Sequence, residues 1–106
     1  MREITTDECR AYLETASPAP LLLDVREPWE YQIVHLENSR LVPMRQIPAA
    51  LDTLDEDQEI IVICHHGIRS RQVALFLESH GFRNVVNLHG GMDAWARNTD
   101  RSLPTY

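Results

Sequence analysis

Few cysteines, no long apolar run and no excess of positive charge mark this 106-residue sequence. Two cysteines, Cys9 and Cys64, are too few for a disulfide framework, so the role of each depends on its own surroundings. No apolar run approaches the roughly 18 residues of a membrane-spanning helix. The formal net charge of -6 argues against nucleic acid and anionic membrane as partners, because both attract basic surfaces.

The length and the polar ends of the chain favour one small domain. The first ten residues lack the apolar core of a signal peptide, which predicts a reducing, cytoplasmic location. The length fits a single domain, residues 1–106, and the content of 43% hydrophobic and 25% charged residues is typical of a globular protein. Residues 97–106 are polar, and we expect them to form a tail that is at best partly ordered.

Segments typical of strands alternate with segments typical of helices along the chain. Thr5 and Glu8 form a capping box that predicts the start of the first helix. Residues 59–63 show no polar–apolar alternation, which is typical of a strand buried on both faces. The pattern predicts an α/β fold with a parallel sheet covered by helices on both faces. The expected strands cover residues 3–4, 21–25, 40–42, 59–63 and 84–88, and the expected helices cover residues 6–14, 28–33, 47–54, 70–80 and a short segment around Trp95.

The loop that follows the strand at 59–63 has the features of an anion-binding site. Gly67 allows a positive φ, and successive backbone N–H groups in such a turn can surround an anion. A helix N-terminus and the charges of Arg69 and Arg71 add to this field. A helix terminus alone contributes only about 0.3–1 kcal/mol, so the loop amides have to supply most of the effect. Together these features favour the thiolate of Cys64, which is the nucleophilic form.

Other potentially reactive residues have simpler interpretations. Cys9 lies in a predicted helix beside Asp7 and Glu8, whose charges would raise its pKa, so we interpret it as structural. His65 and His66 lack the spacing of a zinc site, and no second ligand cluster follows them. We expect no metal, and we expect both histidines to line the rim of the pocket, partly cationic near neutral pH.

Three motifs, in this order and spacing, resemble those of the single-domain rhodaneses, the thiosulfate sulfurtransferase family. They are Leu23–Glu27 (LDVRE), Cys64–Ser70 (CHHGIRS) and Gly90–Trp95 (GGMDAW), and the resemblance covers nearly the whole chain. It implies a rhodanese-like α/β fold with a central five-stranded parallel sheet flanked by helices on both faces. It also implies that Cys64 is the catalytic nucleophile, that it carries sulfur as a persulfide, and that no cofactor is needed.

The resemblance also assigns roles to the neighbours of Cys64. Arg69 is expected to help bind the substrate anion, while Asp24 and Arg26 lie near the pocket and, in our interpretation, form a structural ion pair. The implied donor is a small anion such as thiosulfate, or a persulfide, and the implied acceptor is a thiol or protein thiol. The active-site loop comprises Cys64, His65, His66, Gly67, Ile68 and Arg69, and Ser70 and Arg71 are expected beside the pocket.

Two rival functions stay open, and one segment departs from the family pattern. The domain could be a persulfide carrier or docking module in a sulfur relay, with little turnover of its own. A cysteine phosphatase is disfavoured, because such loops place five residues between cysteine and arginine, whereas four separate Cys64 from Arg69. Residues 34–39 lack two glycines that many family members have before the third strand, although Asn38 can tolerate a positive φ.

Overall fold

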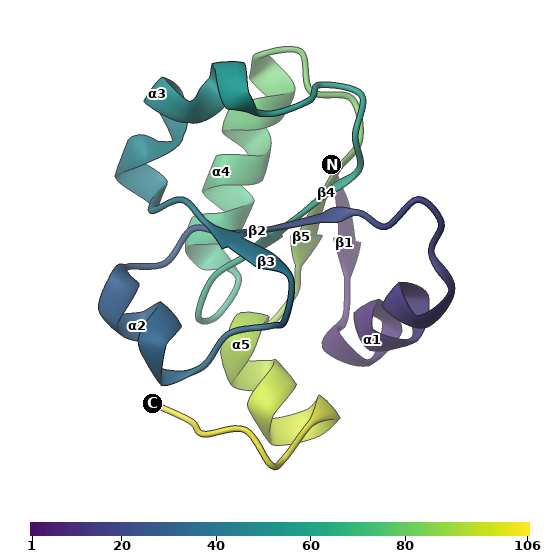
Figure 1. Cartoon of the computed structure of the whole chain (residues 1–106), viewed down its shortest axis with the longest axis vertical. Coiled ribbons are helices and arrows are strands. Elements are labelled where there is room, and N and C mark those ends of the chain that lie inside the picture. Colours follow the sequence, from purple (N-terminus) through teal and green to yellow (C-terminus); the bar gives the residue numbers. More distant parts are fainter.

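A computed structural model describes all residues, 1–106, and contains one five-stranded sheet in which every paired strand is parallel. The strand order is β1-β5-β4-β2-β3, so β4 is the central strand (Figure 1). The strands are β1 (Arg2–Ile4), β2 (Leu21–Asp24), β3 (Ser39–Leu41), β4 (Ile60–Ile63) and β5 (Val85–Leu88). The predicted five-stranded parallel sheet is confirmed.

Helices follow each strand except that the connection after β3 is broken into three short pieces. In this connection the two 3-10 turns η1 and η2 flank α3, where one helix over residues 47–54 was predicted. None of the helices combines the length and apolar character needed to cross a bilayer. The helical segments are α1 (Thr6–Thr15), α2 (Pro28–Ile33), η1 (Met44–Gln46), α3 (Ile47–Ala50), η2 (Leu51–Thr53), α4 (Ile68–Ser79), α5 (Gly91–Ala94) and the π-helical turn η3 (Trp95–Thr99).

The helices cover both faces of the sheet and create two hydrophobic cores, as predicted. In Figure 1, α3 and α4 lie above the sheet, and α1 and α5 lie below it. Val62 of β4 belongs to the core that packs against α4, while its neighbours Ile61 and Ile63 belong to the core beneath α1 and α5. Because successive side chains of a strand point to opposite faces, β4 has to be apolar on both. This explains the lack of alternation in its sequence.

Cys64 follows the carboxyl end of the central strand, and α4 begins four residues later. Residue Gly67 is the N-cap of α4 with φ 97°, a left-handed conformation that suits glycine. This N-cap starts the helix at Ile68, two residues before the predicted start at 70. Ligands of open parallel sheets bind at this edge of the sheet, so the fold places the cysteine where a site is expected.

The segment that lacks the family glycines reaches β3 through a single left-handed residue. Asn38 adopts φ 63°, as the sequence allows. The ring of Tyr31 stacks on that of His35 with centroids 3.9 Å apart, and its hydroxyl donates to the carbonyl of Ser39 at 3.0 Å. These contacts join the end of α2 to the start of β3 across the segment that lacks the expected glycines.

The polar tail differs from the loosely ordered segment predicted from the sequence. It begins within η3 and then turns back, so that Leu103 and Tyr106 pack on the core beneath α1 and α5. Figure 1 shows the C-terminus beside α2. Polar composition concealed this because the contacts depend on two separated side chains rather than on an apolar run.

Candidate active site

The backbone of the loop from Cys64 to Arg69 is held by the start of α5. The N–H of Met92 donates to the carbonyl of Cys64 at 2.9 Å, and the N–H of Asp93 donates to the carbonyl of His65 at 2.9 Å. Gly91 permits this approach, since a Cβ there would lie 2.3 Å from the carbonyl oxygen of Cys64. In a trans peptide the C=O and the following N–H point in opposite directions. The N–H groups of residues 65 and 66 are therefore turned away from α5.

Five backbone N–H groups around this loop make no hydrogen bond within the chain. Two belong to the loop itself and three to the first turn of α4, where a helix leaves its N–H groups without intrahelical partners. Unpaired N–H groups gathered at a helix start form a site that favours negative charge. They are the N–H groups of His65, His66, Ile68, Arg69 and Ser70.

One loop amide contacts the sulfur directly. The N–H of Gly67 donates to Sγ of Cys64 at 3.0 Å, and the Cys64 thiol donates to Oγ of Ser70 at 3.3 Å. The sequence predicts several amides directed at this sulfur, whereas the structure has a single one on Sγ. The residue is only 1% exposed, so almost none of its surface is accessible to water.

Ser70 connects the sulfur to Asn87, a residue that the sequence analysis did not single out. The Ser70 hydroxyl donates to Oδ1 of Asn87, and Nδ2 of Asn87 donates to the carbonyl of Gly67 at 3.2 Å. Both Ser70 and Asn87 are buried. Asn87 therefore fixes the turn at Gly67 and the serine beside Cys64. Its signal in the sequence is a lone amide within the otherwise apolar strand β5.

Arg69 does not extend freely into a pocket. Its Nη1 and Nη2 donate to Oε1 and Oε2 of Glu30 at 2.7 and 2.8 Å, a two-pronged ion pair. Hydrogen bonding from Arg69 lowers the pKa of Glu30 to about 2 against the opposing effect of its burial, so the carboxylate is ionised throughout the neutral range. The same pairing raises the pKa of Arg69. Glu30 is the only acidic residue of α2, and we did not predict its contact with the loop.

Tyr106 completes this group of side chains. Its hydroxyl donates to Oε2 of Glu30 at 2.8 Å and accepts from Nη1 of Arg26 at 3.0 Å. Burial is the main cause that raises the pKa of Tyr106 to about 12, so the hydroxyl keeps its proton. The ring lies 4.0 Å from that of His65, centroid to centroid. The tail thus contacts the loop at His65 as well as the ion pair.

Asp24 and Arg26 form the buried ion pair that the sequence analysis proposed. Neither side chain is exposed, and Nη2 of Arg26 lies 2.7 Å from Oδ2 of Asp24. Arg26 also donates to the carbonyls of Glu30 and Val34, at 3.3 and 2.7 Å. The pair therefore joins β2 to α2 and to the segment behind it. Its contacts support a structural role.

The two histidines of the loop differ from each other, and His65 departs from the expected cationic character. His65 is half-buried, and burial followed by the charge of His66 lowers its pKa, so its imidazole is neutral near pH 7. His66 is exposed, with Nε2 3.8 Å from Oδ2 of Asp93. Potential ligand atoms of His65, His66 and Asp93 lie within 4.8 Å of one another. Three ligands are fewer than a structural zinc site uses, and Asp93 already accepts a hydrogen bond from Arg97.

Arg71 and Cys9 have different surroundings. The N–H of Arg71, predicted beside the pocket, donates to the carbonyl of Gly67 at 3.3 Å, and its side chain pairs with Glu3 at 3.3 Å. Cys9 is completely buried in the core beneath α1. Burial, and then the charge of Glu59, raise the pKa of Cys9 to about 11. The predicted direction is confirmed, but the cause is burial and Glu59 rather than Asp7 and Glu8.

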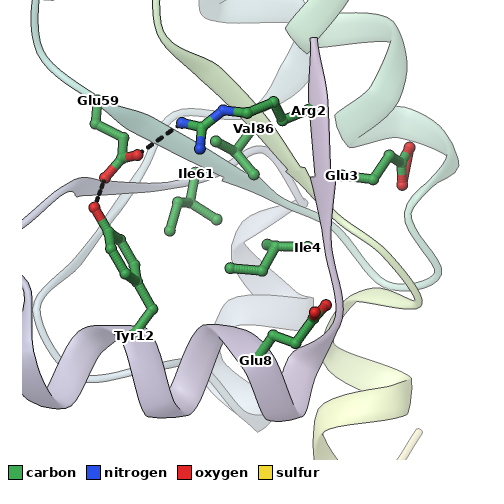
Figure 2. Close-up of a pocket in the computed structure, with 8 residues that line it drawn as sticks. All are labelled: Arg2, Glu3, Ile4, Glu8, Tyr12, Glu59, Ile61 and Val86. Carbon is green, nitrogen blue, oxygen red and sulfur yellow. Dashed lines mark hydrogen bonds and ion pairs between the residues drawn. The ribbon is translucent and has the colours of Figure 1, made fainter.

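A hollow of about 160 Å³ lies beside β1 and reaches Glu59 at the amino end of β4, away from Cys64. Figure 2 shows Arg2 and Tyr12 both directed at the carboxylate of Glu59 there. Arg2 also donates to Asn84 at 2.7 Å. The residues lining this hollow include no cysteine, so it offers no thiol to carry sulfur.

Comparison with known proteins agrees with this geometry. The rhodanese-like domain model matches residues 5–98. The chain is 33% identical to the thiosulfate sulfurtransferase GlpE of Vibrio cholerae, over 72% of each protein. It is 40% identical to the adenylyltransferase and sulfurtransferase uba4 of Ogataea parapolymorpha, over 87% of the chain but only 24% of that longer protein. The crystal structure of a rhodanese-like domain protein from Staphylococcus aureus superposes with a TM-score of 0.85 and 34% identity, covering 100% of this chain and 99% of that one.

The chain belongs to the rhodanese-like domain family. Its fold is that of the family, and relatives of the chain are named as sulfurtransferases. The name of the GlpE relative specifies thiosulfate, and the name of uba4 adds an adenylyltransferase activity. The chain spans about a quarter of the length of uba4, so the functions of such larger proteins do not transfer to it directly.

Proposed function

We propose that this domain moves sulfane sulfur from a donor to a thiol acceptor through a persulfide on Cys64. The observation that carries the proposal is that five N–H groups of the loop and of the first turn of α4 are unpaired, while the N–H of Gly67 between them donates to Sγ. A site of this kind stabilises an anion without a metal ion or an organic cofactor. A reducing compartment such as the cytoplasm suits the proposal, since both cysteines are free thiols.

In the first step, the Cys64 thiolate attacks the outer sulfur of thiosulfate or of a persulfide R–S–SH. The sulfur–sulfur bond of the donor breaks, sulfite or the thiolate RS⁻ leaves, and the outer sulfur stays on Cys64. The new S–S bond places the added sulfur about 2 Å beyond Sγ. Only Gly67 donates to the thiol sulfur, so the other free amides are available to the added, anionic sulfur.

In the second step, the thiolate of an acceptor attacks the outer sulfur of the Cys64 persulfide. The bond between the two sulfurs breaks, the acceptor leaves as a persulfide, and the Cys64 thiolate is restored. The outer sulfur is the atom that the acceptor attacks, so Sγ itself can stay buried during the exchange. Ser70 and Asn87 keep the loop in place through both steps.

A second candidate function is that of a persulfide carrier or docking module in a sulfur relay. Its support is the 40% identity to uba4, a relative in which a similar segment is about a quarter of a protein named for two activities. The residues around Cys64 serve a carrier as well as an enzyme. The two functions differ in turnover: a carrier loads sulfur once and passes it only to a specific partner.

Mass spectrometry of the intact chain after exposure to sulfur donors tests the proposal. Thiosulfate and glutathione persulfide are the donors, and Cys64→Ala and Cys9→Ala are the matched variants. We expect the wild type and Cys9→Ala to gain one sulfur from at least one donor, and Cys64→Ala to gain none. Wild-type protein that stays unmodified with both donors would refute the transfer and support a docking role. Multiple turnovers with a small thiol acceptor would favour the enzyme over the carrier.

A further inference from the structure

The cation expected to receive the substrate anion is already occupied by a carboxylate. Both terminal nitrogens of Arg69 donate to Glu30, whose side chain is only 5% exposed. Glu30 has further donors: the hydroxyl of Tyr106 on Oε2 and the N–H of Glu27 on Oε1, at 2.8 and 3.0 Å. Each oxygen of Glu30 therefore accepts two hydrogen bonds. A carboxylate held in this way does not swing aside easily to free the guanidinium.

The other arginines near the loop also have carboxylate partners. Arg26 is paired with Asp24, and neither side chain is exposed, whereas Arg71 and Glu3 form an exposed pair at 3.3 Å that water screens. Arg26 and Arg69 therefore each have a carboxylate partner that is itself buried. What remains for a negative charge is the group of unpaired N–H groups in the loop after Cys64 and in the first turn of α4.

Thiosulfate and thiol persulfides differ in charge, and the Arg69–Glu30 pair can distinguish them by that difference. Thiosulfate is a dianion, and its leaving group, sulfite, is also a dianion at alkaline pH. The guanidinium of Arg69 and the carboxylate of Glu30 are in direct contact, so a dianion that approaches the one also approaches the other. Its attraction to Arg69 is therefore largely cancelled by its repulsion from Glu30. A thiol persulfide reacts as neutral R–S–SH and releases RS⁻ with a single charge, which needs no free guanidinium.

The surface beside the ion pair also suits an organic donor. A hollow of about 490 Å³ adjoins Arg69. This volume is within the range of sites for small organic molecules and is larger than an inorganic anion needs. Trp29 precedes Glu30 in the sequence and Ile68 precedes Arg69, and both of these apolar side chains are exposed. The lining of the hollow consists of Val25, Glu27, Met44, Arg45, Pro48 and Arg69.

We propose, building on the sulfur transfer proposed above, that Glu30 is a specificity determinant that excludes thiosulfate and selects a thiol-bound sulfane sulfur as the donor. The Cys64 thiolate attacks the outer sulfur of R–S–SH, the S–S bond of the donor breaks, and RS⁻ leaves and takes a proton from water. Cys64 retains S–SH, and no other oxidant or reductant takes part. R is either a small thiol or the cysteine of a protein.

Loading rates of Cys64 with different donors test this proposal. The rate at which the chain gains one sulfur is measured by mass spectrometry with thiosulfate, with glutathione persulfide and with a persulfidated cysteine peptide. The variants are Glu30→Gln, which keeps the shape of the side chain without its charge, and Glu59→Gln as the control. Glu59 has the same kind of partners, an arginine and a tyrosine, at the opposite end of β4.

We expect the wild type to load faster from both persulfides than from thiosulfate. In Glu30→Gln the thiosulfate rate should rise about tenfold, because the guanidinium is no longer neutralised, while the persulfide rates change by less than about twofold. Glu59→Gln should match the wild type with every donor. The faster of the two persulfides identifies the source of the sulfur as a small thiol or a protein cysteine.

Two results would overturn the proposal without touching the transfer itself. One is a wild type that loads from thiosulfate as fast as from persulfides, a measurement that needs no variant. The other is a folded Glu30→Gln protein whose ratio of donor rates is unchanged. Failure of Cys64 to load from all three donors would instead overturn the proposed function, and the selectivity with it.

Discussion

Two clusters of the molecule combine the same three kinds of side chain at opposite ends of the central strand. Glu59 immediately precedes β4 and accepts from Arg2 and Tyr12 (Figure 2). At the other end, Cys64 follows β4, and the loop that it begins carries Arg69, which is bound to Glu30 and through it to Tyr106. We call them the Glu59 cluster and the Glu30 cluster.

The comparison shows that composition alone does not make a site. At the carboxyl end of β4 the chain turns into a helix whose first N–H groups are unpaired, whereas no helix begins at its amino end. The Glu59 carboxylate is 16% exposed and its Arg2 partner 63%, so water screens this pair. In the Glu30 cluster the corresponding values are 5% and 35%, and the charges interact more strongly.

The largest difference in stability between the clusters is expected from removal of the arginines. Arg69→Gln leaves the buried carboxylate of Glu30 without its cation. Breaking a buried pair costs about 3–5 kcal/mol, and we expect about 2–3 kcal/mol here because Arg69 is partly exposed. Arg2→Gln should cost less than about 1 kcal/mol, as is usual for surface pairs. Urea denaturation at pH 7 measures both changes.

Equal losses of stability in the two variants would contradict the contrast between the clusters. A loss in Arg69→Gln that high salt abolishes would do the same, because salt screens exposed pairs far more than buried ones. The comparison of both variants at low and high salt therefore separates burial from simple charge pairing.

Acid is expected to weaken the Glu30 cluster at a defined pH. The pKa of Glu30 is lowered from an ordinary value of 4.5 to about 2, so the unfolded chain takes up its proton first. The stabilisation is complete above about pH 4.5 and is lost as the pH falls toward 2. Between pH 7 and pH 3 this residue should account for a loss of about 2 kcal/mol in the free energy of unfolding.

Glu30→Gln is the variant that isolates this contribution. It should be less stable than the wild type at pH 7, and its stability should fall less between pH 7 and pH 3, so that the two curves converge in acid. Denaturation curves that run parallel over this range would show that Glu30 is not the responsible carboxylate.

The fold and the turn after Cys64 were accessible from the sequence because local signals define them. The capping box at Thr5 is present as predicted, and so is the pairing of Asp24 with Arg26, two residues apart in the chain. The turn at Gly67 likewise depends on its own backbone, and φ there is positive. Such features need no knowledge of which segments meet in space.

The partners of the loop were not accessible because they come from distant parts of the chain. Glu30 lies 39 residues from Arg69, and Asn87 lies 17 residues from Ser70. Tyr106 reaches Glu30 across 76 residues, through a tail whose composition indicated little order. A charged loop can be recognised from its amino-acid sequence, but whether its charges are paired with opposite charges depends on tertiary contacts. The pairing of Arg69 with Glu30 was missed for this reason.

The smallest expected effect concerns the two tyrosine hydroxyls. Tyr106→Phe removes the donor to Glu30 and an acceptor for Arg26, both of them buried, and should cost about 1 kcal/mol in the free energy of unfolding. Tyr12→Phe removes a hydroxyl that donates to Glu59 at the surface, where water can replace it, and should change stability by less than about 0.5 kcal/mol. Urea denaturation resolves the difference if both variants are measured against the wild type in parallel. A Tyr106→Phe protein as stable as Tyr12→Phe would mean that the Tyr106 hydroxyl contributes nothing to the Glu30 cluster in solution, and that Arg69 and the N–H of Glu27 hold the carboxylate in place without it.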